Sequence, residues 1–97
     1  MKAIFLTYNQ AYNEEIAEVL ESFGQRGYTR WQEIQGRGTN DGIPRMGSHA
    51  WPEMNNAIFT VVEDGLVDGI LKEVKRRDEE AQALGLRAFV WNIETIY

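Results

Sequence analysis

The residues of this chain that are best suited to chemistry gather in one irregular segment, residues 35–56. This segment contains both prolines, the only histidine and two of the three methionines. Long connections without regular structure are uncommon in small domains, and those that occur often carry function. We therefore expect the functional part of the protein to be the loop formed by residues 36–56.

The start of this loop has the composition of an anion-binding site. Gly36, Arg37 and Gly38 follow one another directly. Glycines allow the backbone to approach a ligand closely, and a guanidinium binds phosphate or carboxylate groups. These three residues are our candidates for binding an anionic effector, and a flexible hinge that opens the loop is the structural alternative.

A second group of residues in the loop suits a metal ion. His49, Met46, Met54 and Trp51 lie within nine residues of one another. Imidazole and thioether groups suit Cu(I), and an indole face attracts cations. Zinc would instead favour His49 together with Glu53. The structural alternative is that Trp51 and Met54 anchor the loop to an apolar surface while His49 makes a structural hydrogen bond.

The composition excludes several classes of function. There is no cysteine, and Ser48 has no second histidine to complete a nucleophilic site with. Fifteen acidic residues against ten basic ones give a net charge of -5, which disfavours nucleic acid as a partner. No apolar run approaches the ~20 residues that span a membrane, so we expect no membrane insertion and a cytoplasmic location.

The elements that must position this loop follow from the hydrophobic pattern. Ninety-seven residues, 43% of them hydrophobic, predict one globular domain over residues 1–97. Apolar stripes at helical spacing predict helices over residues 12–23 and 65–84, each followed by glycine. Alternating β-forming residues predict strands over residues 2–8, 28–35, 57–62 and 86–93.

This order of elements, β-α-β-β-α-β, predicts an α+β, ferredoxin-like fold. Such a fold has a four-stranded antiparallel sheet with two helices on one face. The third predicted strand is apolar on both sides, with Phe59 and Val61 opposite Ile58 and Val62. Because helices cover one face only, the other face would expose a large apolar patch, and we expect it to pack against the sheets of other subunits.

The chain also resembles the P-II signalling proteins, from its second predicted strand onward. Glu33 to Gly38 is similar to the Glu-x-x-Gly-x-Gly-like stretch that leads into the long T-loop of that family, and residues 40–55 stand in the place of the T-loop. The later resemblance covers the third strand and its acidic turn (57–64), the start of the second helix (67–74) and the last strand (86–94).

The resemblance implies a homotrimeric regulatory protein rather than an enzyme. Its loop would sense a small effector, a metal ion or a nucleotide, and dock on a partner such as a membrane transporter. Residues 79–86 do not match the Thr-Gly-x-x-Gly-Asp-Gly segment that holds nucleotide phosphates in the family, so a transition metal (Cu or Zn) is favoured over ATP or ADP as the ligand. Gly36, Arg37 and Gly38 are the nucleotide-site positions that the resemblance transfers to this chain.

Three other functions compete with this interpretation. The first is a metal-tolerance protein of the similar CutA type, which binds copper or zinc without signalling. The second is a small ferredoxin-like enzyme, a dimer with an enclosed pocket, in which His49 acts as acid or base. The third is a plain interaction module, whose stability neither metal nor nucleotide would change.

Overall fold

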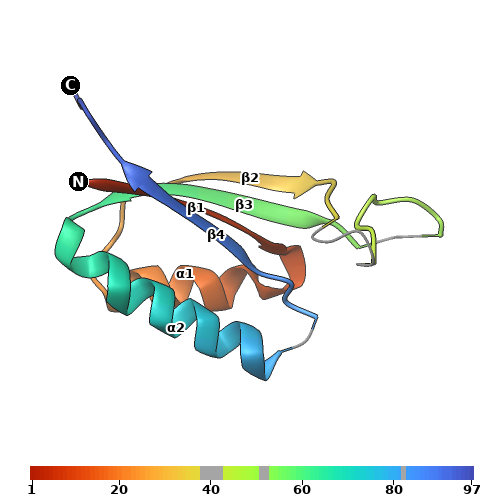
Figure 1. The fold of residues 1–97 in the computed structure, drawn as a ribbon. Coiled ribbons are helices and arrows are strands. Elements are labelled where there is room, and N and C mark those ends of the chain that lie inside the picture. Colours follow the sequence, from red (N-terminus) through yellow and green to blue (C-terminus); the bar gives the residue numbers. More distant parts are fainter. Residues whose placement is uncertain (38–42, 51–52, 82) are drawn as a thin grey trace.

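The computed structural model describes residues 1–37, 43–50, 53–81 and 83–97. Its four strands form one sheet in the order β2-β3-β1-β4, and all neighbouring strands run antiparallel. Both helices lie on the same side of this sheet (Figure 1), which confirms the predicted ferredoxin-like fold. The elements, in chain order, are β1 (Lys2–Asn9), α1 (Asn13–Ser22), β2 (Thr29–Ile34), β3 (Asn55–Val62), α2 (Val67–Glu80) and β4 (Arg87–Asn92).

The hydrophobic core lies between the sheet and the two helices. Alternate residues of a strand point to opposite faces, so β1 directs Ile4, Leu6 and Tyr8 toward the helices, where all three are fully buried. The same alternation in β3 buries Ile58 and Val62. The apolar stripes of the helices complete this core with Ile16, Val19 and Leu20 from α1 and Val67, Ile70 and Val74 from α2.

The second helix ends earlier than its apolar spacing predicts. We expected it to run to residue 84, but α2 stops at Glu80, and Leu84 is fully buried from a non-helical connection instead. The connection is held by tertiary hydrogen bonds: the Leu84 carbonyl accepts from the Asn9 amide at 2.8 Å, and the Asp78 carboxylate accepts from the Leu86 amide at 3.0 Å. A continuing helix would forfeit both bonds. We call residues 81–86 the connector.

The first helix begins and ends close to where the sequence indicates. The Asn9 side chain accepts a hydrogen bond from the Ala11 amide at 3.0 Å and so caps a 3-10 turn, Gln10–Tyr12, that leads into α1. At the other end, Gly24 has φ +74°, and the Gln25 amide donates to the Leu20 carbonyl at 3.0 Å. This is the left-handed helix termination that glycine favours.

The face of the sheet opposite the helices carries a row of aromatic side chains, which we call the aromatic face. Its rings form two tilted pairs, Phe5–Trp31 at 6.2 Å and Phe59–Trp91 at 5.9 Å between centroids. Trp31 on β2 and Trp91 on β4 are nearly half exposed, and Phe89, two residues before Trp91, is 54% exposed. The prediction that the sheet is apolar on both sides is therefore confirmed.

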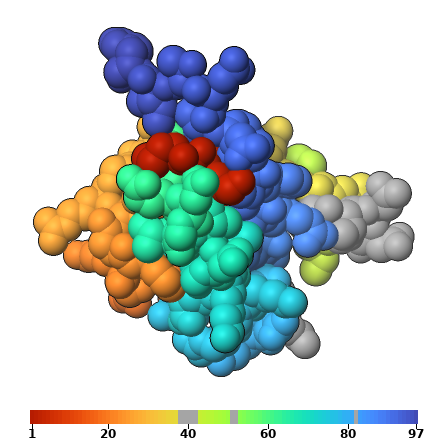
Figure 2. Space-filling model, turned by 60° about the vertical axis from the view of Figure 1, so that its left-hand side comes forward, coloured from red at the N-terminus to blue at the C-terminus, as the bar shows by residue number. Residues whose placement is uncertain are grey.

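Both ends of the chain lie at the end of the sheet that is remote from the loop (Figure 1). The Met1 amine lies 2.9 Å from the Asp64 carboxylate, and the Met1 carbonyl accepts a hydrogen bond from the Ile93 amide at 3.2 Å. Beyond that bond the last residues stand clear of the body, as the dark-blue atoms of Figure 2 show, and Tyr97 is fully exposed. Within the described part of the chain, no helix is long and apolar enough to cross a bilayer.

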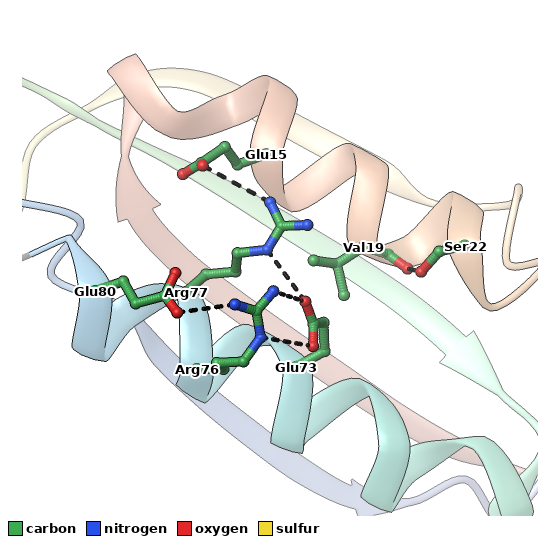
Figure 3. Close-up of polar contacts among 7 residues, drawn as sticks. All are labelled: Glu15, Val19, Ser22, Glu73, Arg76, Arg77 and Glu80. Atoms are coloured by element: carbon green, nitrogen blue, oxygen red, sulfur yellow. Dashed lines mark hydrogen bonds and ion pairs between the residues drawn. The ribbon is translucent and has the colours of Figure 1, made fainter.

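A network of ion pairs joins the outer surfaces of the two helices (Figure 3). The Glu73 carboxylate accepts from Arg76 at 2.5 Å and from Arg77, one helical turn further on, at 3.1 Å. Arg77 also reaches Glu15 of α1 at 3.7 Å, and Arg76 reaches Glu80 at 2.9 Å. Hydrogen bonds from both arginines lower the pKa of Glu73 from an ordinary 4.5 to about 2.

The network makes the stability of the fold depend on pH in a defined way. Because the pKa of Glu73 is lower in the folded state, its ionised carboxylate stabilises the fold above about pH 4.5, and that contribution is lost as the pH falls toward 2. We expect the melting temperature of Glu73→Gln to lie below that of the wild type at pH 7, and the difference to shrink between pH 4.5 and 2. Calorimetric melting of both proteins across this range measures it. Glu79→Gln, which removes an exposed carboxylate outside the network, is the control, and a difference that persists at pH 2 would contradict the assignment.

Candidate functional site

A hollow of about 490 Å³ lies at the base of the loop, where the loop meets the connector and the start of β4. It lies at one end of the sheet, beside the last residue of β2 and the first residues of β3 and β4. Its size is within the range of small-molecule binding sites in proteins. It is lined by Thr7, Ile34, Gln35, Gly36, Arg37, Ile43, Arg45, Glu53, Asn55, Ala83, Gly85, Arg87 and Phe89.

The charge of this hollow is opposite to that of the whole chain. Arg37, Arg45 and Arg87 line it, and Glu53 is the one carboxylate among the described residues that do so. The chain as a whole carries a net charge of -5. Concentrated positive charge in a concave surface raises the local concentration of anions and repels cations. The electrostatics of the hollow therefore favour an anionic ligand over a metal ion.

Arg45 connects three separate parts of the hollow. Its backbone pairs with that of Gly36 through two hydrogen bonds, at 2.8 and 2.7 Å, which tie Arg45 to the limb of the loop that leaves β2. Its guanidinium donates to the Asn55 side chain at 2.9 Å and to the Ala83 carbonyl of the connector at 2.9 Å. The side chain is only 14% exposed, and its hydrogen bonds to Asn55 and Ala83 fix the loop to the body of the protein.

Gly85 makes room for this guanidinium. Gly85 has φ +58°, a left-handed conformation that L side chains rarely adopt. A Cβ atom added there would lie 2.6 Å from both terminal nitrogens of Arg45. The connector thus approaches Arg45 closely because residue 85 has no side chain.

Buried asparagines brace the surroundings of the hollow. Asn9 donates to the Ala83 carbonyl at 3.1 Å, so that this oxygen accepts from two side chains. Asn56 donates to the Asn13 side chain at 3.2 Å, and Tyr8 donates to the same oxygen at 2.5 Å. Burial raises the pKa of Tyr8 to about 12, so this hydroxyl stays a donor at physiological pH.

The end of β2 is shaped by the same group of asparagines. The pairing of β2 with β3 shifts between Trp31 and Ile34, as in a β-bulge. Within the bulge, Glu33 has φ 55°, and its amide donates to the Asn56 side chain at 3.2 Å. This irregularity directs the chain from the strand into the Gly36–Arg45 pair.

The structure places two of the three predicted anion-binding residues on the hollow. Gly36 and Arg37 line it, and Gly38 lies outside the described residues. Sequence reasoning missed Arg45 and Arg87. No periodic pattern in the sequence marks Arg45. Arg87 is the first residue of β4, so the predicted strand over residues 86–93 already indicated that it lies beside the connector.

The structure describes three of the four predicted metal-binding residues. Met54 places its sulfur against Gly47, the Met46 carbonyl accepts from the Gln35 side chain at 3.0 Å, and His49 is exposed. Trp51 lies outside the described residues. Over the described ranges, no three histidine, aspartate or glutamate side chains are grouped to hold a metal ion. The metal set stays a prediction.

Solved structures of P-II-like proteins share this fold. CPII from Thiomonas intermedia K12, a nitrogen regulatory PII-like protein solved with ADP, AMP and bicarbonate, matches with a TM-score of 0.78 and 22% identity, over 95% of this chain and 84% of that one. Its apo form matches with a TM-score of 0.69 and 17% identity, over 95% and 89%. A putative PII-like signaling protein from Thermus thermophilus gives 0.66 and 22%, over 95% and 85%.

Sequence comparison identifies the family. No curated protein sequence is significantly similar to this chain. The family model described as "Nitrogen regulatory protein P-II" matches residues 1–97, which confirms the resemblance found from the strand and loop motifs. This chain therefore belongs to the P-II family.

Proposed function

We infer that this protein is a P-II-like regulator whose hollow binds an anionic effector, an adenine nucleotide in the first instance. The observation that carries this proposal is the convergence of Arg37, Arg45 and Arg87 on one concave site in an otherwise acidic chain. Guanidinium groups bind phosphates through paired, charge-assisted hydrogen bonds.

The walls of the hollow suit the remainder of a nucleotide. Ile34, Ile43 and Phe89 supply apolar surface, and Ile43 and Phe89 are more than half exposed. Such surface gains from being covered by a base or by a neighbouring subunit. CPII was solved with ADP, AMP and bicarbonate, all of them anions, and this supports a nucleotide or a small oxyanion over the metal ion favoured by the sequence.

A homotrimer is the second part of the proposal. The aromatic face exposes Trp31 on β2 and Phe89 and Trp91 on β4, with the rings of Phe5 and Phe59 packed against the two tryptophans, and large apolar patches on soluble proteins usually mark interfaces. Phe89 belongs both to this face and to the lining of the hollow. A neighbouring subunit packed on the aromatic face would therefore also border the effector site.

The proposed mechanism is a change in the balance between two loop states. The hollow contacts the loop in three places: Gly36 and Arg37 where it leaves β2, Arg45 in the middle, and Glu53 where it returns to β3. An effector shifts such a balance only by its difference in affinity for the two states. We propose that one state docks on a cytoplasmic partner, such as the cytoplasmic side of a transporter, and that the protein catalyses no reaction itself.

Native mass spectrometry tests both parts of the proposal. We expect a trimer that takes up one ADP or AMP per subunit and does not take up uncharged adenosine. Bicarbonate, Cu(I) and Zn(II) are added in separate experiments. A monomer or dimer would overturn the assembly. Metal uptake that is lost in His49→Ala, without nucleotide uptake, would favour the metal-binding alternative.

Arg87→Gln tests the contribution of charge in the hollow. Losing a charge-assisted hydrogen bond to phosphate costs about 1.5–3 kcal/mol, so we expect ADP affinity to fall by about tenfold or more. Isothermal titration calorimetry measures the change. Arg26→Gln removes the same charge from an exposed residue that does not line the hollow, and its affinity should equal that of the wild type. Equal losses in both variants would show a general charge effect instead.

Gly85→Ala tests whether the position of Arg45 matters for binding. The new methyl group would collide with the guanidinium, so we expect ADP affinity to fall. Gly24→Ala is the matched control, because Gly24 has φ +74° and nothing within 4 Å of the added carbon. Backbone strain costs about 1 kcal/mol of folding stability in each. Unchanged ADP affinity in Gly85→Ala would exclude Arg45 from the binding site.

A further inference from the structure

The Arg45 side chain is only 14% exposed, yet its hydrogen bonds are incomplete. Its two terminal nitrogens donate to Asn55 and to the Ala83 carbonyl, but its Nε atom, which is shielded from solvent, has no hydrogen-bond partner among the described residues. A buried donor without an acceptor is costly, and such groups are rare in folded proteins. An oxygen acceptor that reached Nε from the hollow would remove this cost.

Among the described residues, Glu53 brings a carboxylate close to this nitrogen. Its oxygen lies 4.0 Å from Nε, too far for a hydrogen bond but close enough for attraction between the charges. The Glu53 side chain is 55% exposed and borders the same hollow. Any anion that enters the hollow therefore meets a guanidinium that already has an internal partner of the same charge as the ligand.

We propose that Glu53 and the anionic effector compete for the guanidinium of Arg45. Effector binding then exchanges a contact within the loop for a contact with the ligand. The proposal rests on the function proposed above, because it requires that the hollow takes up an anion. It adds two points to that function. The first is that the pair of Arg45 and Glu53 responds when the effector occupies the hollow, and the second is that Glu53 lowers the affinity for the effector.

The geometry also indicates how this exchange would reach the loop. Arg45 is tied to the outgoing limb through its two backbone bonds with Gly36, whereas Glu53 lies on the limb that returns to β3. Their attraction draws the two limbs together. A ligand that replaces Glu53 keeps the pair between Arg45 and Gly36 and releases the returning limb from Arg45.

The test is a double-mutant cycle with ADP as the probe and calorimetry as the measurement. The proteins are the wild type, Glu53→Gln, Arg45→Gln and the double variant. Glu63→Gln is the control, because Glu63 is an exposed glutamate that follows the opposite end of the same strand, β3, and changes the net charge equally. Exposed ion pairs are weak, so we expect Glu53→Gln to bind ADP about two- to fivefold more tightly and Glu63→Gln to match the wild type.

The double variant decides whether Glu53 acts through Arg45. With Arg45→Gln in place, Glu53→Gln should no longer tighten binding; an equal gain in both backgrounds would overturn the competition. Unchanged affinity in Glu53→Gln, with ADP binding intact in the wild type, would overturn this inference alone. Absence of ADP binding in the wild type would overturn the proposed function with it.

A second measurement does not depend on whether Arg45→Gln folds. In the wild type, ADP should leave hydrogen exchange at the Arg45 amide slow, because its bond to Gly36 is kept, and should speed exchange at the Gly47 amide, which donates to the Glu53 carbonyl at 3.3 Å. Slower exchange at both amides on ADP binding would contradict the release of the returning limb.

Discussion

The organisation of this molecule depends on one constraint: its sheet has two apolar faces, and its two helices cover only one of them. Ile4, Leu6 and Ile58 on the covered face form the core, whereas Trp31 and Trp91 on the other remain about half exposed. Burial of apolar area is the main driving force of folding and association, and the single chain buries only part of the apolar area that its sheet presents. The hollow is bordered by this uncovered face, because Phe89 belongs to both, and it lies at the end of the sheet where the loop and the connector meet.

At that edge the arrangement is maintained by polar groups rather than by packing. Asparagines at the ends of β1 and β3 and the guanidinium of Arg45 hold the loop against the connector. Hydrogen bonds of this kind have narrow geometric requirements, and they break or form individually. A site built from them can therefore change conformation without disturbing the hydrophobic core beneath it, which is what a regulatory loop requires.

Much of the fold was predictable from the sequence because the hydrophobic pattern records it directly. The alternation in β1 and β3 predicts which residues face the helices, and Gly24 marks the end of α1. The end of α2 was not predictable in this way, because it depends on a hydrogen bond from the Asn9 amide of β1 to the Leu84 carbonyl and on one from the Leu86 amide to the Asp78 carboxylate. The same applies to the site: Gly36 and Arg37 are recognisable from local spacing, but Arg45 is identified only by what it touches in three dimensions. The metal-binding set, chosen by residue type alone, has no structural support of this kind.

The Ala83 carbonyl, which accepts from both Asn9 and Arg45, has a wider consequence. A backbone oxygen is present whatever amino acid occupies position 83, so nearly any substitution there leaves the acceptor in place. The two hydrogen bonds that join loop and connector therefore depend on the side chains at positions 9 and 45 and not on the side chain at position 83, whose carbonyl accepts both. Substitutions at position 83 can therefore accumulate without loss of this junction, whereas Gly85 of the same connector is held constant by the space that Arg45 occupies.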